Sequence, residues 1–404
     1  MLSDYTSLMR AGVRLVRGTT TRLLWKFAWN FGMRNMVNMS RFERRLRRGE
    51  PFYPAFVMIS VTETCNLACS GCWVSHGGKK CLTPSQLDGI INQSKKQGSY
   101  FFGILGGEPL MYNGLLDVLA KHPDCYFQIF TNATLITMPL AKRMADLGNI
   151  TLLISIEGLE EESDRRRGRH DVYARTLDGL RAARRAKLIF GAAASIGRSN
   201  YQQLVSRRYL DMLIDEGAAF MWYYIYRPVG AVPNPDNALT REQVKGLRTF
   251  IVEQRRMAPI VIIDTYWGAD GQAFCPAATG MSHHISPSGA VEFCPPLQMA
   301  GEWLNSDASN LAEIFNNSKF LADLRHMTAQ TSRGCILLED PQKLASFLKQ
   351  YNVSETTTRQ TFMAELEKMT HHAGHDMRDD AVAEKNPLYR LLQKHYFFGF
   401  GAYG

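Results

Sequence analysis

The sequence of 404 residues has no stretch of the roughly 18 uninterrupted apolar residues that a membrane-spanning helix needs. Its most apolar N-terminal run, residues 23–33, is short and contains Lys26. Cysteine is scarce as well, because eight residues at irregular spacings do not form the framework of a disulfide-rich secreted domain. We therefore expect a cytoplasmic protein with reduced thiols, either soluble or peripheral on the inner face of a membrane.

Acidic residues are rare in the first 50 positions. Eleven Lys or Arg residues stand there against three acids, a balance of +8, whereas the whole chain carries +9. One interpretation is an amphipathic helix whose aromatic side meets a membrane and whose basic side meets anionic lipid or another polyanion. A second is a helix packed on the following domain with solvated arginines. The apolar character disfavours a third, a removable transit peptide.

From about residue 55, short runs rich in β-branched and aromatic residues alternate with longer helical patterns. This alternation predicts an α/β fold with a parallel sheet and outer helices, either open or curled into a full or partial barrel. Functional side chains of such folds gather at the carboxyl ends of the strands. The expected strands are residues 56–62, 100–105, 126–131, 151–156, 188–196 and 220–227, and the expected helices are 84–97, 113–120, 139–147, 172–187, 201–216 and 240–257.

Three thiols follow the first expected strand directly. Cys65, Cys69 and Cys72 have the spacing C-x3-C-x2-C within the stretch ETCNLACSGCW. Thiolates are soft ligands that suit zinc or an iron–sulfur cluster, and three on one short loop can hold three corners of a cubane. A closed zinc site would need a fourth ligand, such as Cys81. The spacing and the strand-end position therefore favour a cluster over zinc.

This arrangement resembles the radical S-adenosylmethionine (radical SAM) superfamily, in which the C-x3-C-x2-C motif follows the first strand of a partial (βα)6 barrel. The resemblance covers residues 55–230, because the next three strand ends carry GGEP, TNATLI and SIEGLEEESDRRRGR, each similar to a family segment. It implies that the three cysteines hold a catalytic [4Fe-4S] cluster. It also implies that S-adenosylmethionine is bound by Gly106, Gly107, Glu108, Thr131, Asn132, Ser155, Glu157 and Arg167.

Two positions depart from the family pattern. Gly71 stands where an aromatic residue usually precedes the third cysteine, and Ala133 stands where the family has the glycine of its TNG segment. We expect Trp73, just after the third cysteine, to stack on the adenine instead. Glu108 is expected to add a negative charge beside the methionine amino group.

The resemblance implies a reaction as well as a fold. An electron from the reduced cluster cleaves S-adenosylmethionine into methionine and a 5'-deoxyadenosyl radical, which takes a hydrogen atom from an unactivated carbon. The electron would come from a reducing partner such as ferredoxin or flavodoxin.

Three more cysteines follow the expected barrel. Cys275 and Cys294 flank a segment that resembles the start of SPASM or twitch extensions, which carry auxiliary iron–sulfur clusters, and Cys335 follows in SRGC. The PSG turn between them predicts a hairpin with Cys275 and Cys294 at its ends. Because a full SPASM domain needs more cysteines, we expect at most one auxiliary cluster, with a fourth ligand from elsewhere. The alternative is a degenerate extension in which the three are buried thiols.

The last 70 residues carry two further features. The stretch THHAGHDMRDD contains His371, His372 and His375 near acids, and we expect an exposed polar loop there rather than a metal site. The aromatic, glycine-rich terminus KHYFFGFGAYG is expected to dock, for example over the barrel mouth.

Four parts are therefore expected: a basic helical segment at 1–50, a radical SAM barrel at 51–258, a SPASM- or twitch-like extension at 259–340 and a helical tail at 341–404. The basic, aromatic N-terminus favours an enzyme for a lipid-like or membrane-associated substrate. The extension favours the alternative, a peptide- or protein-modifying maturase. The barrel region has no basic stripe, so nucleic acid is not an expected partner.

Overall fold

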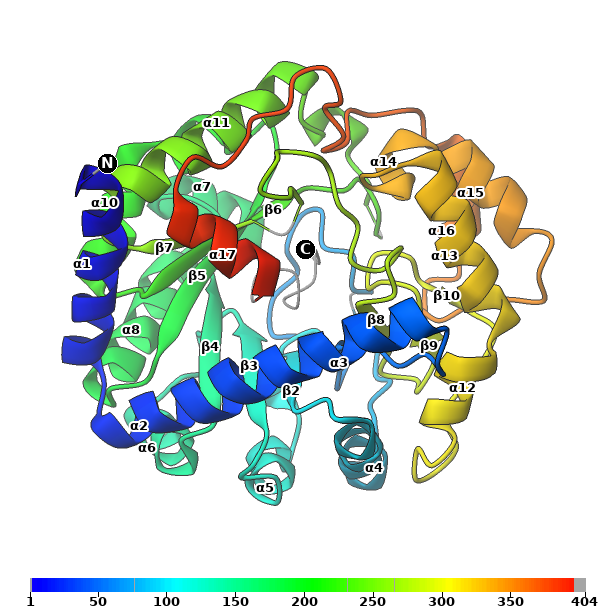
Figure 1. The fold of residues 1–404 in the computed structure, drawn as a ribbon, viewed down its shortest axis with the longest axis horizontal. Helices are drawn as coiled ribbons and strands as arrows, with labels where there is room; N and C mark the ends of the chain where they lie inside the picture. The colour runs from blue at the N-terminus through cyan, green and yellow to red at the C-terminus, as the bar shows by residue number, and fades with distance from the viewer. Residues whose placement is uncertain (1, 76, 231, 265, 396–404) are drawn as a thin grey trace.

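The computed structural model describes residues 2–75, 77–230, 232–264 and 266–395. Its centre is a nine-stranded sheet in the order β7-β6-β5-β4-β3-β2-β1-β8-β9, in which β9 alone runs antiparallel to its neighbour. The sheet curls, and β7 and β9 form its two edges within the described residues, so the barrel is partial (Figure 1). The predicted fold class is thereby confirmed.

The six predicted strands and six predicted helices lie close to their ranges, except that residues 201–216 form two helices, α9 and α10; α7 and β7 have no predicted counterpart. The strands are β1 (Phe56–Ser60), β2 (Phe101–Leu105), β3 (Tyr126–Thr131), β4 (Ile150–Ser155), β5 (Phe190–Ile196), β6 (Phe220–Ile225), β7 (Val261–Ile263), β8 (Ser282–Ile285) and β9 (Val291–Glu292). The helices of the barrel are α4 (Pro84–Gln97), α5 (Leu115–Ala120), α6 (Met138–Leu147), α7 (Glu160–Arg167), α8 (Val172–Arg185), α9 (Tyr201–Leu204), α10 (Arg207–Glu216) and α11 (Arg241–Met257).

The remaining elements follow the sheet or connect it. They are η2 (Pro109–Met111), η3 (Pro235–Asn237), β10 (Met299–Ala300), α12 (Leu311–Asn317), α13 (Lys319–Thr331), α14 (Ile336–Glu339), α15 (Pro341–Leu348), β11 (Ser354–Glu355), α16 (Phe362–Lys368) and α17 (Pro387–His395).

Local sequence signals set the ends of the barrel helices. Thr83 and Thr240 begin α4 and α11, each in a capping box with a glutamine three residues later. Gly98, Gly148 and Gly217 end α4, α6 and α10 in the left-handed conformation that glycine adopts most easily. These short-range signals determine where each following strand enters the barrel.

The expected extension from residue 259 begins inside the barrel's own sheet. β7 pairs with β6, and β8 pairs in parallel with β1. β8 and β9 form the expected hairpin around the PSG turn. On β8, His284 bonds to Glu292 and to the Ser60 hydroxyl at 2.8 Å, so this histidine ties the hairpin to β1.

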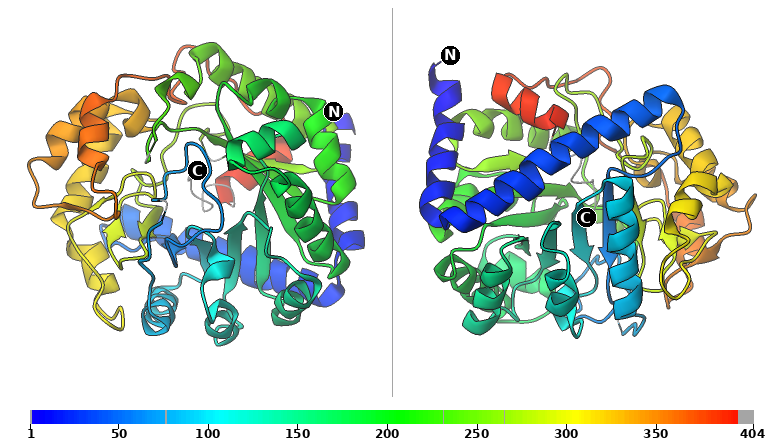
Figure 2. Two further views of the ribbon diagram at one scale, coloured as in Figure 1. Left: turned by 180° about the vertical axis from the view of Figure 1, so that it is seen from behind. Right: turned by 60° about the horizontal axis from the view of Figure 1, so that its bottom comes forward.

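The N-terminal segment forms a helical strap, made of α1 (Leu2–Gly18), α2 (Thr21–Lys26), η1 (Phe27–Met33) and α3 (Arg34–Arg48). Figure 1 shows the strap and α17 in front of the sheet, and the reverse view in Figure 2 shows them behind it. They cover the end of the barrel at which the strands begin, which we call the barrel floor. Phe31 of the strap packs against Phe101 with ring centroids 5.0 Å apart, and Leu23 is buried.

Several cations of the strap bond to backbone carbonyls at the carboxyl ends of barrel helices. Arg14 donates to a carbonyl of α10 and to one just after α11, both at 2.6 Å. Arg22 and Lys26 donate to carbonyls of the last turn of α6. These carbonyls lack partners within their helices and carry partial negative charge. The strap packs on the barrel, as the second of the two interpretations expects, but its arginines are not simply solvated, because half-buried Arg14 and exposed Arg22 both donate to backbone carbonyls.

Another set of apolar side chains of the strap points outward. We call Trp25, Trp29, Met33 and Val37 the apolar stripe, because they recur every fourth residue and are 46% to 67% exposed. The rings of Trp25 and Trp29 stack with centroids 6.0 Å apart. Across the described part of the chain, no helix combines the length and the apolar character needed to cross a membrane.

The histidine-rich segment near the C-terminus differs from its expectation. His371 is exposed as expected, but His375 is buried, with its ring centroid 4.7 Å from that of Tyr266. The expected exposed loop is therefore wrong at His375. Most of the aromatic terminus that was expected to dock, residues 396–404, lies outside the described residues.

Replacing Arg14 by alanine should lower the free energy of unfolding by about 1–2 kcal/mol, because two helix-end carbonyls lose a charged donor. Arg10→Ala, at an exposed position of the same helix, should change it by less than about 0.5 kcal/mol. Urea unfolding of both variants checks the expectation. Equal losses for the two would contradict a capping role of Arg14.

Candidate functional site

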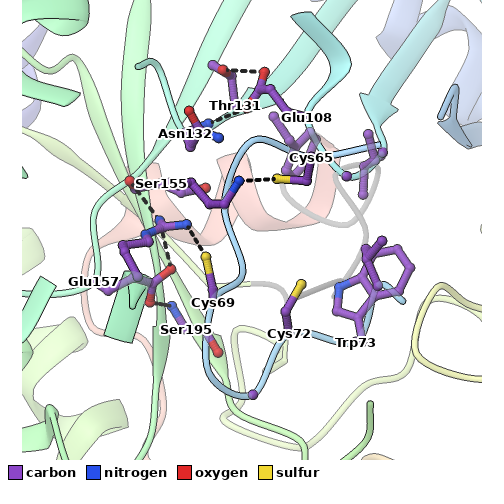
Figure 3. A pocket seen from close by; sticks show the side chains of 18 of the residues that line it. Cys65, Cys69, Cys72, Trp73, Glu108, Thr131, Asn132, Ser155, Glu157 and Ser195 are labelled. Carbon is purple, nitrogen blue, oxygen red and sulfur yellow. Dashed lines mark hydrogen bonds and ion pairs between the residues drawn. The ribbon is translucent and has the colours of Figure 1, made fainter. Parts of the chain in front are cut away.

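A pocket opens at the carboxyl ends of β1 to β6, opposite the barrel floor (Figure 3). Each of the first four strand ends supplies side chains that the sequence singled out, and the ends of β5 and β6 add Ser195 and Tyr224. The predicted residues that line it are Cys65, Cys69, Cys72, Trp73, Gly106, Gly107, Glu108, Thr131, Asn132, Ser155, Glu157 and Arg167. The structure therefore brings all twelve to one place.

The three cysteines lie on the loop that follows β1. The Leu67 N–H donates to the Cys65 sulfur at 3.4 Å, and the Cys72 N–H donates to the Cys69 carbonyl at 3.3 Å. Burial raises the pKa of Cys65 to about 11. Burial, and then the neighbouring Cys69, raises the pKa of Cys72 to about 12. A metal that binds here must displace the thiol protons.

The donor set fits an iron–sulfur cluster. Three soft sulfur donors on one loop face the same pocket (Figure 3). Within the described ranges, no three His, Cys, Asp or Glu side chains are gathered closely enough to share a single metal ion. A cubane does not require this, because each of its irons takes one protein thiolate.

The loop after β2 crosses the cysteine loop at very close range. The Gly107 N–H donates to the Thr62 carbonyl at 2.7 Å. A Cβ atom at Gly107 would lie 2.4 Å from the Glu63 carbonyl oxygen and 2.5 Å from that of Thr64. Both neighbours are backbone atoms that cannot move aside independently, so this crossing requires glycine.

Glu108 links the loop after β2 to the end of β3. It is 1% exposed, and its carboxylate accepts from the Thr131 hydroxyl at 2.7 Å, the Asn132 N–H at 2.8 Å and the Leu110 N–H at 3.1 Å. Burial raises the pKa of this carboxyl group, and the hydrogen bonds oppose that shift. Glu108 thus holds two strand ends together, and its expected action on a ligand amino group stays a prediction.

The end of β3 is also tied to the cysteine loop. The Asn132 side-chain amide donates to Asn66 at 2.9 Å. Ala133 has a φ of 62°, in the left-handed region. The alanine that replaces the expected glycine therefore adopts the backbone conformation for which glycine is usually needed.

Arg167 connects the cysteine loop to the end of β4. Its guanidinium donates to the Cys69 sulfur at 3.4 Å, the Ser155 carbonyl at 3.0 Å and Glu157 at 3.3 Å. Burial alone would lower the pKa of Arg167, but Cys69 and Glu157 outweigh it and raise that pKa. A cation fixed beside a cysteine sulfur stabilises its thiolate.

Two further residues of the site were not singled out as ligand contacts. Arg166 pairs with Glu157 at 3.0 Å, and the Ser195 N–H donates to the same carboxylate at 3.0 Å. Arg166 lies in the arginine run that the sequence drew attention to, but nothing local distinguishes it from its neighbours. Ser195 carries no sequence signal beyond its place near a strand end.

Tyr226 explains the departure at Gly71. A Cβ atom on Gly71 would lie 2.7 Å from a ring carbon of Tyr226, so the position before Cys72 has no room for an aromatic side chain. Trp73 lines the pocket, and its ring meets His284 edge-on at 5.9 Å. Its expected stacking on adenine stays a prediction.

The second group of cysteines also gathers at one place, around Arg227. The Arg227 guanidinium donates to the Cys335 sulfur at 3.1 Å. Burial raises the pKa of Cys275 to about 11 and that of Cys294 well above its usual value, and the charge of Cys335 adds to both shifts. Three thiols far apart in the sequence therefore lie near one cation; Cys335 is buried, and Cys275 and Cys294 are half-buried.

The part of the chain that matches a known family lies in the barrel that forms the cysteine pocket. A family model, Radical SAM superfamily, matches residues 59–195. Fe-coproporphyrin III synthase of Methanosarcina barkeri (strain Fusaro / DSM 804) is 26% identical over 208 residues, which cover 50% of this chain and 51% of that protein. Sporulation killing factor maturation protein SkfB of Bacillus subtilis (strain 168) is 23% identical over 163 residues, covering 38% of this chain and 39% of that protein. The chain spans about half the length of the curated relatives it matches.

Among solved structures, Streptococcus suis SuiB bound to S-adenosylmethionine has a TM-score of 0.57 and 17% sequence identity, and the match covers 70% of each chain. SuiB bound to its precursor peptide SuiA gives the same TM-score of 0.57. At this identity the likeness shows a shared fold.

Gly107→Ala should lower the free energy of unfolding by about 1–3 kcal/mol, since the new methyl group overlaps two backbone carbonyls. Gly12→Ala is the matched control, because no atom lies within 4 Å of its added Cβ and alanine favours a helix by up to about 1 kcal/mol. Urea unfolding measures both changes. A Gly107→Ala protein as stable as the wild type would show that the two loops can separate freely.

Proposed function

We propose that this chain, an enzyme of the radical SAM superfamily that uses a [4Fe-4S] cluster and S-adenosylmethionine, abstracts a hydrogen atom from a lipid-like or membrane-associated substrate. When bound, the reduced cluster supplies the electron that splits S-adenosylmethionine into methionine and the 5'-deoxyadenosyl radical that attacks an unactivated carbon. The apolar stripe is the observation that favours a lipid-like or membrane-associated substrate.

The residues around the pocket divide the remaining work. Cys65, Cys69 and Cys72 bind three irons of the cluster, and Arg167 balances the negative charge of their thiolates. Glu157 accepts from two arginines and from the Ser195 N–H, so its role is to orient Arg166 and Arg167.

The other walls of the pocket bind the nucleoside and the methionine group of S-adenosylmethionine. The backbone at Gly106 and Gly107, beside Glu108, faces the methionine end. Side chains of Thr131, Asn132 and Ser155 supply polar atoms for the ribose, and Trp73 supplies an aromatic surface for the adenine. The electron comes from a reducing partner such as ferredoxin or flavodoxin.

A membrane surface suits the outer side of the strap. Large exposed apolar side chains, two of them tryptophans, prefer the headgroup boundary of a bilayer. Exposed cations flank the apolar stripe on the same strap and favour anionic lipid, by about 1 kcal/mol each near the surface. They are Arg10, Arg17, Arg44, Arg47 and Arg48.

A peptide substrate is the second candidate. It is favoured by the three cysteines around Arg227, because auxiliary clusters accompany the SPASM-type maturases that this chain resembles. SkfB is named a maturation protein, and SuiB has been solved with a precursor peptide. We propose that Cys275, Cys294 and Cys335 hold one auxiliary cluster, with a fourth ligand from another residue or from the substrate.

The two cysteine groups can be counted separately after anaerobic reconstitution. The wild type should hold about eight irons, and replacing Cys65, Cys69 and Cys72 by alanine should leave about four and abolish reductant-dependent 5'-deoxyadenosine. Replacing Cys275, Cys294 and Cys335 should also leave about four irons, but S-adenosylmethionine cleavage should continue.

About four irons in the wild type, falling to none without the first three cysteines, would make the second group structural. Zinc in place of iron, with no 5'-deoxyadenosine, would overturn the proposed radical chemistry.

Sedimentation with phosphatidylglycerol vesicles tests the membrane surface. A Trp25→Ser/Trp29→Ser variant should bind at least about tenfold more weakly, because each exposed tryptophan loses its insertion into the bilayer. Trp303→Ser is the matched control, since Trp303 is exposed but lies outside the strap. If the wild-type protein stays in the supernatant while the vesicles sediment, even at low salt, this result would contradict a membrane-associated substrate.

A further inference from the structure

The apolar stripe and the cysteine pocket lie at opposite ends of the barrel, and a second cavity lies between them. This floor cavity has a volume of about 540 Å³ and is lined by the beginnings of β2 to β7, by the strap helices α1 and η1, and by Leu392 of α17. Its lining contains no charged side chain among the described residues. Its size falls within the roughly 300–1,000 Å³ typical of small-molecule sites.

One polar side chain of the floor cavity calls for a ligand. Gln128 of β3 lines the cavity and is 1% exposed, and neither its amide nitrogen nor its amide oxygen has a hydrogen-bond partner within the described residues. Leaving a buried polar atom unsatisfied costs about 1–3 kcal/mol. A hydroxyl group can accept a hydrogen bond from the amide nitrogen and donate one to the amide oxygen. It therefore satisfies this side chain better than a group that can only donate or only accept.

The mouth of the floor cavity lies on the outer side of the strap. Gly12 of α1 and Ala28 of η1 line the cavity and are exposed. Around them, exposed apolar side chains continue along the strap, including Met9 and Val13 on α1 and the apolar stripe, which runs from α2 through η1 into α3. A hydrocarbon chain that leaves a bilayer bound at the stripe therefore meets an apolar rim before it meets the cavity.

The floor cavity and the cysteine pocket belong to one barrel lumen. Gln128 lines the floor cavity, and Phe130, two residues later on the same strand and therefore on the same face, lines the cysteine pocket. Phe130 packs against Trp222 at 6.3 Å, so these rings form a layer between the two spaces.

We propose that the floor cavity binds the hydrocarbon chain of an uncharged single-chain lipid that carries a hydroxyl group, which Gln128 hydrogen-bonds. The lipid enters from the membrane surface between α1 and η1. Without a cation in the lining, a carboxylate or phosphate has no compensating charge there, so the bound group is neutral. That such a lipid is also the substrate rests on the proposed function, whereas its binding does not.

Equilibrium dialysis of radiolabelled 1-dodecanol against the anaerobically reconstituted enzyme tests the proposal. We expect saturable binding of one molecule per chain, at least about tenfold tighter than that of dodecanoate. Gly12→Leu should weaken it at least about tenfold by filling the mouth. This variant should fold, because no atom lies within 4 Å of its Cβ and leucine favours a helix over glycine.

Two further variants make the test specific. Gln128→Leu keeps the cavity apolar and removes the amide, so it should weaken 1-dodecanol at least about tenfold. Gly18→Leu, at another open glycine of α1 that does not line the floor cavity, should bind like the wild type. Formation of 5'-deoxyadenosine, measured in parallel, should be the same in Gly18→Leu and the wild type.

Non-saturable binding, equal binding by Gly12→Leu, or no preference over dodecanoate would overturn the proposal. Binding that appears only in a chain ending at His395 would also overturn it, because residues 396–404 would then be the occupant. Loss of 5'-deoxyadenosine in the wild type, with 1-dodecanol still bound, would instead count against the radical chemistry alone.

Discussion

The buried carboxylate of Glu108 is the interaction on which the geometry of the site depends. It accepts hydrogen bonds from the end of β3, while the glycine before it lets its own loop touch the cysteine loop at backbone distance. The ends of β1, β2 and β3, which are far apart in the sequence, are thereby held together. A buried charge with all its oxygens bonded is costly to disturb, so the cysteine loop rests on a rigid support.

Both cysteine groups share one electrostatic device, a buried arginine that donates to a cysteine sulfur. Arg167 does so to Cys69 at 3.4 Å, and Arg227 does so to Cys335 at 3.1 Å. A buried guanidinium requires a negative partner, and several thiolates in a dry site require a cation. The arginine and the cysteines therefore balance each other's charge: Arg167, at the end of α7, lies beside Cys69, and Arg227, just after β6, lies beside Cys335.

The strap contributes to both stability and function, because its inner face packs on the barrel and its outer face is exposed. Inward, its aromatic side chains close the barrel floor, and its cations neutralise the carboxyl ends of the barrel helices. Outward, it leaves tryptophans and aliphatic side chains exposed around the mouth of the floor cavity. Removing the whole strap would therefore disturb the barrel as well as the surface, and single outward substitutions separate the two effects.

The sequence by itself determined the parts whose signals are local. The alternation of strand and helix patterns, the spacing of Cys65, Cys69 and Cys72 and the order of the strand-end motifs are all read from short stretches, and together they predicted the barrel and the residues that line its pocket. Only the tertiary structure decided that Tyr226 fills the space at Gly71, that β8 pairs with β1 and that a cavity with Gln128 lies above the strap. Those features join residues far apart in the chain, and their distances depend on how far the sheet curls before its edges meet other elements. No short stretch of sequence encodes that curvature, because it arises from the packing of every strand and helix at once.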